Sequence, residues 1–340
     1  MNKNRIVTGI GVVLLITGIV GSIWSGIEVM PKLINDAQSV QENLNQHEIL
    51  YKGQIDLAKL NINSKTSNVI IKKYDGKDII VERSGNKNLS TITTKEGAKE
   101  LTINEELNNN NDLGKSIDDM VRYFVDELYT SNNSDITVYI PDNVDINVNT
   151  NNGGLYIDNV SANNFNFKTQ YGNISLNENS NIKSLNIKSN SDISLKVSEI
   201  YCIENLSIES NYVNIYEGTF AKDESKVPEN VKIFAQGSVD IDTNLPIAKN
   251  LDITSNETVD LNLPILDYKF NFDIKTSNCI SFDNDSVNKY LGTSLEKYFN
   301  FNDNEYTFSE RSFKGFINEE LINNPTEYFV NIRSSNVDFN

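Results

Sequence analysis

Short runs of alternating apolar and polar residues fill most of the chain, and the runs come in pairs. From residue 144 onward, each pair has two apolar residues two positions apart, a polar link, and two more apolar residues with the same spacing. Alternation with a period of two predicts strands with one apolar side, and links rich in Ser, Thr, Asn and Gly predict turns. The pairs repeat every 19 to 25 residues, and they open at Ile146, Phe165, Leu185, Leu206, Val231, Leu251 and Phe272.

One such pair of strands cannot bury its apolar side, whereas a stack of repeats encloses a continuous core. The sequence therefore predicts an all-β fold, a β-solenoid similar to a single-stranded β-helix, with rungs of about 20 residues. Its inward side chains should stack in columns. The expected inward residues are Ile146, Val148, Phe165, Phe167, Leu185, Ile187, Leu206, Ile208, Val231, Ile233, Leu251 and Ile253.

The same pattern occurs near both ends of this region. It appears in LNINSKTSNVIIK at 60–72 and again in VNIRSSNVDF at 330–339, so both ends should belong to one architecture. Strand-like runs at 79–82, 90–94 and 101–104 are less regular, and we expect them to cap the open end of the solenoid.

Two stretches change to the period of an amphipathic helix. SIDDMVRYFVDEL at 116–128 and SVNKYLGTSLEKYFNF at 286–301 each place their apolar residues on one side. We expect two short helical insertions that cover the solenoid, and a groove for a partner is the alternative reading.

The N-terminal segment has the character of a membrane anchor. Residues 6–24 contain no charged side chain, and this length is close to that of one bilayer-spanning helix. Lys3 and Arg5 precede the run, so the N-terminus is expected inside the cell membrane, in a single-pass topology. A cleaved signal peptide is the alternative. The predicted parts are a cytoplasmic tip and transmembrane anchor at 1–30, a helical stalk at 31–50 and an extracellular strand-repeat domain at 51–340.

Charge and residue inventory exclude several classes of function. The formal net charge is −17, from 47 acidic and 30 basic residues, so binding to nucleic acid is not expected. One histidine, His47, and two cysteines, Cys202 and Cys279, are too few for histidine-based catalysis or a zinc site. Nucleotide-binding and acyl-transfer motifs are lacking as well, and no cofactor is expected.

Three segments resemble a bacterial family of β-strand-repeat domains that are labelled putative adhesins and whose function is unassigned. They are LNINSKTSNVIIKKYDGKDIIVE at 60–82, SDITVYIPDNVDINVNTNNGGLYI at 134–157 and KTQYGNISL at 168–176. The resemblance extends over roughly residues 55–340. It implies a solenoid-like β fold at the cell envelope, with no catalytic residues to carry over.

Two kinds of chemistry need examination. Asp240 and Asp260 occupy equivalent places in adjacent rungs and should point outward about one rung apart, a spacing that a pair of glycosidase carboxylates could use. Oxygen-rich loops at 283–286 and 301–305 could bind calcium, although Asp and Asn also favour turns without any metal.

The leading hypothesis is a membrane-anchored surface module, an adhesin or other binding module, that is not an enzyme. Its partner would be a cell-wall polymer, a glycan or a protein. An envelope-associated regulatory or scaffolding protein is the alternative, and a polysaccharide-active enzyme is the third hypothesis. Because binding energy usually comes from a few aromatic anchors, the expected ligand contacts are those of the late insertion, Tyr290, Tyr298, Phe299 and Phe301.

Overall fold

The structure is a computed structural model that describes residues 47–76, 78–85, 90–108, 134–177, 179–217, 226–265, 267–282, 307–308, 311–317 and 326–340. The chain divides into two compact units. The second unit consists of His47–Arg83, Ser90–Asn108 and Ser134–Asn340, and it holds all described residues except Ser84 and Gly85.

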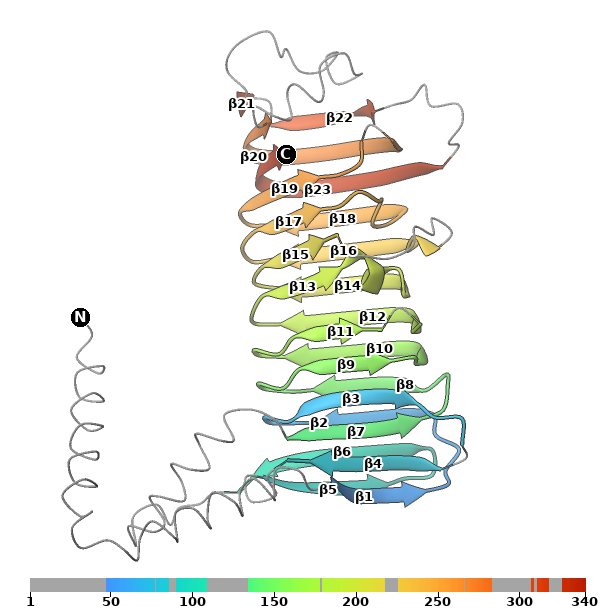
Figure 1. Cartoon of the computed structure of the whole chain (residues 1–340). Helices are drawn as coiled ribbons and strands as arrows, with labels where there is room; N and C mark the ends of the chain where they lie inside the picture. The colour runs from blue at the N-terminus through green and yellow to red at the C-terminus, as the bar shows by residue number, and fades with distance from the viewer. Residues whose placement is uncertain are drawn as a thin grey trace, which may run out of the picture. The chain divides into compact units, whose positions relative to one another are not determined.

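Strands of the second unit stack on one another and form two long sheets (Figure 1). Sheet 1 begins with an antiparallel pair, β5 and β6, continues in parallel through nine further strands, and ends on the antiparallel strand β22. In spatial order its strands are β5 (Ser90–Glu96), β6 (Glu100–Leu107), β2 (Lys59–Asn63), β8 (Asp145–Asn149), β10 (Ser161–Thr169), β12 (Asn181–Ser189), β14 (Ile203–Ser210), β16 (Asn230–Ala235), β18 (Asn250–Ser255), β23 (Glu327–Phe339), β20 (Lys269–Phe282) and β22 (Ser312–Ile317).

Sheet 2 has two parts. The first part has the spatial order β1 (His47–Gly53), β4 (Ile79–Ser84), β7 (Asp135–Ile140), β3 (Asn68–Lys73), β9 (Leu155–Asp158) and β11 (Ile174–Leu176). The second part consists of β13 (Ile193–Lys196), β15 (Val213–Tyr216), β17 (Val239–Asp242), β19 (Thr258–Asn262) and the C-terminal halves of β23 and β20, with β21 (Thr307–Phe308) paired to β20. β1 begins at His47, inside the range expected for a stalk.

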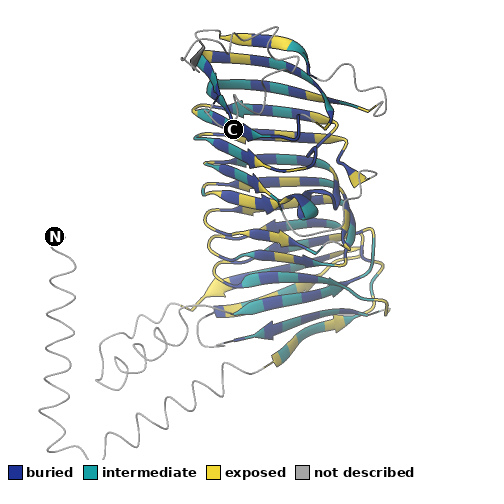
Figure 2. Cartoon of the chain, turned by 45° about the horizontal axis from the view of Figure 1, so that its top comes forward, coloured by how far each residue is buried: buried dark blue, intermediate teal, exposed yellow. Residues whose placement is uncertain are grey.

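Alternation along each strand places every second side chain in the core (Figure 2). In register, Phe165 of β10 lies between Ile146 of β8 and Leu185 of β12, and the column continues through the later strands. All twelve residues predicted to face inward are buried, so the predicted columns are confirmed. The solenoid therefore has the core that the period-two pattern predicts.

At both ends, spatial order departs from chain order. β2 lies between β6 and β8, although about 40 residues of chain separate β2 from β6. β23, the last strand, lies between β18 and β20, and its second half lies between β19 and β20. One strand near each end of the described chain, β2 or β23, is thus inserted as a rung between rungs formed by other segments.

Turns between the two sheets contain a buried line of hydroxyl side chains. The Thr150 hydroxyl donates to the Gly153 carbonyl oxygen at 2.7 Å, and the Gly172 N–H donates to the Thr169 hydroxyl oxygen at 2.7 Å. Neighbouring turns approach closely here, since a Cβ at Gly153 would lie 2.0 Å from the Ser67 carbonyl oxygen. Glycine is required at this position because no side chain fits between the stacked turns.

The predicted fold class needs correction in its helical part. Among the described residues the only helix is α4 (Val197–Ile200), which was not predicted, and none is long and apolar enough to span a membrane. The predicted transmembrane helix at 6–24 and both helical insertions, at 116–128 and 286–301, lie outside the described residues. Most described links between rungs are short turns, which leaves helices little room there.

Candidate functional site

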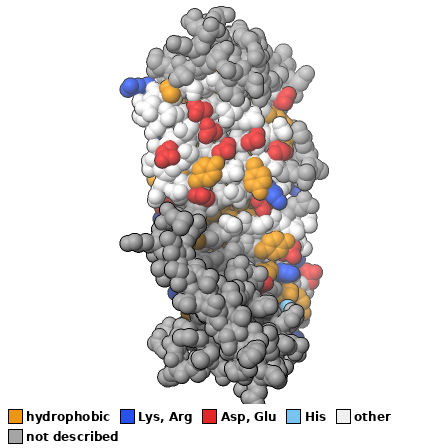
Figure 3. All heavy atoms as spheres, turned by 60° about the vertical axis from the view of Figure 1, so that its left-hand side comes forward, with side chains coloured by type: hydrophobic (Ala, Val, Ile, Leu, Met, Phe, Trp, Pro, Cys, Tyr) orange, Lys and Arg blue, Asp and Glu red, His pale blue; other side chains and the backbone are white. Residues whose placement is uncertain are grey.

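Three aspartates from successive strands of sheet 2 form an acidic ladder. Asp240 of β17 pairs in register with Asp260 of β19, which in turn pairs with Asp338 of β23. Each carboxyl points outward because the residues on either side of it, such as Val239 and Ile241, are buried in the core. Neighbouring Cα atoms along such a column are about 4.8 Å apart. Figure 3 shows acidic side chains gathered on one face of the molecule.

The ladder has polar neighbours at both ends. The Tyr212 hydroxyl donates to the Oδ2 atom of Asp240 at 3.4 Å, and the Ser281 hydroxyl donates to the Oδ1 atom of Asp338. Partial burial and the negative charges of Asp338 and Asp240 raise the pKa of Asp260 to about 6. Burial also raises the pKa of Tyr212, and the Asp240 charge adds to that effect. The ladder therefore holds one carboxyl, that of Asp260, whose pKa lies near neutrality.

This arrangement could act in two ways. A carboxyl with a raised pKa, such as that of Asp260, beside a second carboxyl could serve as the acid of a glycosidase pair. A positively charged group placed on the ladder would instead relieve the repulsion among the three carboxylates. No group of three or more metal-ligating side chains with metal-site geometry occurs among the described residues.

The outward, adjacent-rung placement predicted for Asp240 and Asp260 is confirmed. The third member, Asp338, was missed. Its rung was identified from the sequence, but chain order gives no sign that this rung lies against β19. Ser281 of β20, whose rung follows that of Asp260 in chain order, lies one strand further along, beside Asp338.

A second unusual carboxyl, Glu105 of β6, lies in the core at the other end of the solenoid. Its Oε2 atom accepts hydrogen bonds from the Ser64 hydroxyl and from the backbone N–H groups of residues 65–67. Its Oε1 atom accepts from the Ser67 and Ser90 hydroxyls at 2.6 and 2.8 Å. Burial alone would raise the pKa of Glu105, but these donors outweigh it and lower the pKa to about 2. Glu105 holds the turn after β2 in place.

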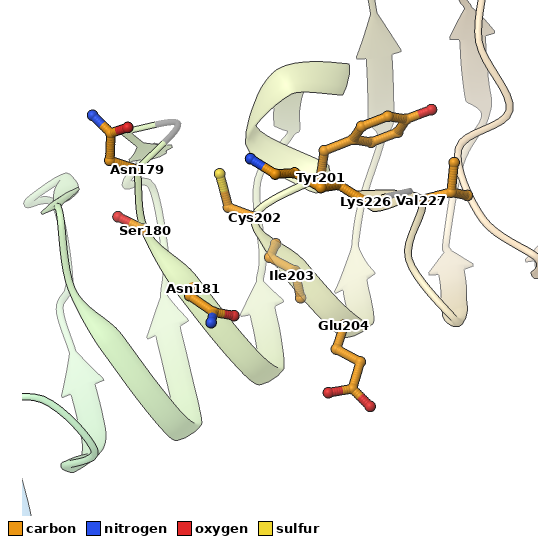
Figure 4. A pocket seen from close by; sticks show the side chains of 9 residues that line it. All are labelled: Asn179, Ser180, Asn181, Tyr201, Cys202, Ile203, Glu204, Lys226 and Val227. Carbon is orange, nitrogen blue, oxygen red and sulfur yellow. The ribbon is translucent and has the colours of Figure 1, made fainter. Parts of the chain in front are cut away.

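A pocket of about 500 Å³ lies beside α4 and the start of β14 (Figure 4). The Tyr201 hydroxyl donates to the Pro246 carbonyl oxygen at 2.6 Å, and the buried Cys202 thiol donates to the Ser198 carbonyl oxygen at 3.4 Å. Neither Cys202 nor Cys279 forms a disulfide with a residue that the structure describes. The residues that line the pocket are Asn179, Ser180, Asn181, Tyr201, Cys202, Ile203, Glu204, Lys226 and Val227.

The predicted ligand contacts are not among the described residues. Tyr290, Tyr298, Phe299 and Phe301 all lie in 283–306, as do both oxygen-rich loops considered for calcium. They remain predictions from the sequence.

Comparison with known families decides where this fold belongs. The family model described as Toastrack DUF4097 matches residues 57–284, about two thirds of the chain. The chain belongs to this Toastrack family. The resemblance noted from the sequence is thereby confirmed, and the match covers the solenoid from just before β2 to just past β20. No curated protein matches the chain.

Two solved structures are similar to the Toastrack chain at low identity. A protein from Bacteroides fragilis titled "putative adhesin" is 9% identical with a TM-score of 0.33, over 87% of this chain and 97% of that one. A protein from Clostridium sporogenes titled "putative cell adhesion protein" is 12% identical with a TM-score of 0.22, over 87% and 99%. Similarity at this level carries no argument about what the Toastrack chain binds.

Proposed function

We propose that this Toastrack domain is a non-catalytic binding module that holds its partner against the outer sides of its sheets. The observation that carries the proposal is the straight columns of outward side chains. On sheet 1 the amide of Asn186 donates to Asn166, that of Asn166 to Asn147, and that of Asn147 to Asn61. These bonds, 2.8 to 3.0 Å long, fix polar groups at a repeat of one strand spacing. A regular surface of this kind suits a partner that itself repeats.

Binding can be tested with the full-length protein on a sensor surface. Cell-wall fragments, soluble glycans and intact cells are passed over it, and saturable retention of at least one of them is expected. Retention of none would contradict the proposal.

We also propose that the module is attached to the cell membrane through its N-terminal segment, with the main domain outside. Support comes from the uncharged run at 6–24 and from Lys3 and Arg5 before it. Protease added to intact, wall-stripped cells should remove the large domain, and a protected domain would contradict this location.

A second candidate function, cleavage of a polysaccharide, is favoured by one observation, the pKa of about 6 for Asp260 beside Asp240. Such a pair could supply the acid and the nucleophile of a retaining glycosidase. Incubating the protein with polysaccharides and assaying for new reducing ends tests it. Activity that disappears in both Asp240→Asn and Asp260→Asn would replace the non-catalytic proposal, and absence of cleavage by the parent protein would end this candidate.

A further inference from the structure

The outer side of sheet 1 changes character at its C-terminal end. Across β23, β20 and β22 the outward residues include two aromatic rings and a surplus of positive charge, in a chain whose net charge is −17. Four outward side chains are basic and two are acidic. We call this surface the terminal face, and its outward residues are Glu327, Phe329, Asn331, Arg333, Lys269, Asn271, Asp273, Lys275, Ser312, Lys314 and Phe316.

Two rings stand on the terminal face at a defined separation. Phe329 of β23 and Phe316 of β22 both pair in register with Asn271 of β20, from opposite sides. The two Cα atoms are therefore about two strand spacings apart, roughly 10 Å. Phe329 is 45% exposed, and Phe316 is partly exposed. A β-linked glycan advances by a similar length with each disaccharide, and the apolar faces of its sugar rings stack on aromatic side chains.

Between the rings lies a polar group that is free to bind. Within the described part of the chain the Asn271 side chain makes no hydrogen bond, whereas the outward amides of Asn147, Asn166 and Asn186 bond to one another. Its amide offers both a donor and an acceptor to a sugar hydroxyl.

Four residues further along β23 and β20, the terminal face carries positive charge that favours an acidic partner. The Asp273 carboxylate forms ion pairs with both Arg333, at 3.2 Å, and Lys314, at 3.6 Å, so one negative charge offsets only one of these two cations. Lys275 lies next to Arg333 in register, is exposed, and forms no ion pair with any residue that the structure describes. Two positive charges are thus left over on the terminal face, because Glu327 offsets only Lys269. The acidic ladder on sheet 2 has the opposite sign and would repel the same partner.

We propose that the terminal face binds an acidic, β-linked polysaccharide laid across β23, β20 and β22. Successive disaccharides stack on Phe329 and Phe316, a hydroxyl group between them bonds to Asn271, and the carboxylates of the polymer lie near Lys275 and Arg333. This inference rests on the proposed function and specifies the class of its partner.

The test uses the full-length protein and hyaluronan fragments, which carry one carboxylate in each β-linked disaccharide, with carboxyl-reduced fragments as the neutral comparison. The parent protein should bind hyaluronan, should bind the reduced form more weakly, and should lose affinity as salt is raised. Phe329→Ala and Phe316→Ala should each weaken binding about tenfold, as expected for anchor residues. Lys275→Ser should weaken it roughly two- to fivefold, as expected for an exposed charge.

Two control variants separate binding from folding. Phe234→Ala removes a ring that is 39% exposed on sheet 1 but lies on β16, outside the terminal face, and should leave affinity unchanged. Phe329→Tyr keeps a ring in place and should retain binding, even if Phe329→Ala does not fold.

Equal affinity for both forms of the polymer would overturn the acidic class. Unchanged hyaluronan binding by the two ring variants, with or without a loss in Lys275→Ser, would overturn the stacking on Phe329 and Phe316 and with it the placement of the polymer across β23, β20 and β22. Absence of hyaluronan binding overturns the inference alone if the same preparation still retains cells or cell-wall fragments, and it overturns the proposed function too if nothing is retained.

Discussion

Rungs in the middle of the solenoid and rungs at its two ends are assembled differently. From β8 to β18 each strand of sheet 1 lies against the strand that precedes it in that sheet along the chain. At the ends, β2 and β23 are inserted between strands from distant segments. The two carboxyls with the largest pKa shifts lie at these insertions, Glu105 against the turn after β2 and Asp260 against β23. Middle rungs carry outward columns of Asn together with exposed ion pairs such as Lys188–Glu209, whereas at each insertion a carboxyl becomes partly or wholly buried.

The largest expected effect on stability comes from the inward columns, which the middle rungs and the end rungs share. Phe167→Ala in the middle and Phe272→Ala at the C-terminal end should each lower the free energy of unfolding by about 3 to 5 kcal/mol, because both rings are buried. Denaturant unfolding measures this. Lys168 is the exposed neighbour of Phe167, and Lys168→Ala serves as the control. It should change the free energy of unfolding by less than about 0.5 kcal/mol. If Phe167→Ala leaves the free energy of unfolding unchanged, the inward register is wrong.

A smaller loss is expected at the first insertion. Glu105→Gln should lower the free energy of unfolding at pH 7 by about 3 kcal/mol, since the pKa of Glu105 is lowered from 4.5 to about 2. A lowered pKa in the folded state stabilises above pH 4.5, and that stabilisation is lost as the pH falls toward 2.

The difference between parent and Glu105→Gln should therefore shrink as the pH is lowered through this range. Exposed Glu106→Gln, on the same strand, is the matched control and should behave like the parent. A difference that does not depend on pH would contradict the role assigned to the carboxylate.

The effect at the second insertion has the opposite sign. Asp260 has a raised pKa, so its ionised form destabilises the fold above about pH 6, and this penalty disappears as the pH falls toward 3.8. Asp260→Asn should raise the free energy of unfolding at pH 7 by about 1 kcal/mol, a value reduced for the partial exposure of the side chain.

At pH 4 the gain of Asp260→Asn should vanish. Asp242→Asn, on the neighbouring outward column, is the control and should bring little change at either pH. An equal gain at pH 4 and pH 7 would show that charge repulsion within the ladder is not the cause.

The sequence predicts well what depends on local pattern. Period-two alternation identifies Phe165, Phe167 and their equivalents as inward, since burial of one strand side is a property of each repeat. It also places Asp240 and Asp260 outward on adjacent rungs, because β17 and β19 follow one another in sheet 2.

Neighbours brought together by an insertion cannot be predicted in this way. Every rung has the same apolar pattern, so the pattern of VNIRSSNVDF fits any place in the stack and does not indicate that Asp338 lies beside Asp260. Glu105 occupies an inward position of β6, where the alternating pattern predicts an apolar residue. From the sequence alone, a charged residue there indicates only that the strand is irregular. Except for Ser90, its hydrogen-bond partners come from the turn at 64–67, and only the insertion of β2 brings this turn near.

The insertion of β23 can be tested most directly with one native cysteine. Asn336 of β23 pairs in register with Cys279 on one side and with Thr258 of β19 on the other. Asn336→Cys should therefore form a disulfide with Cys279 under mild oxidation, because paired Cα atoms lie within the range that a disulfide spans. Thr258→Cys should form none, since β23 separates it from Cys279. A disulfide between positions 258 and 279, without one between 336 and 279, would show that rungs follow chain order and would contradict the account.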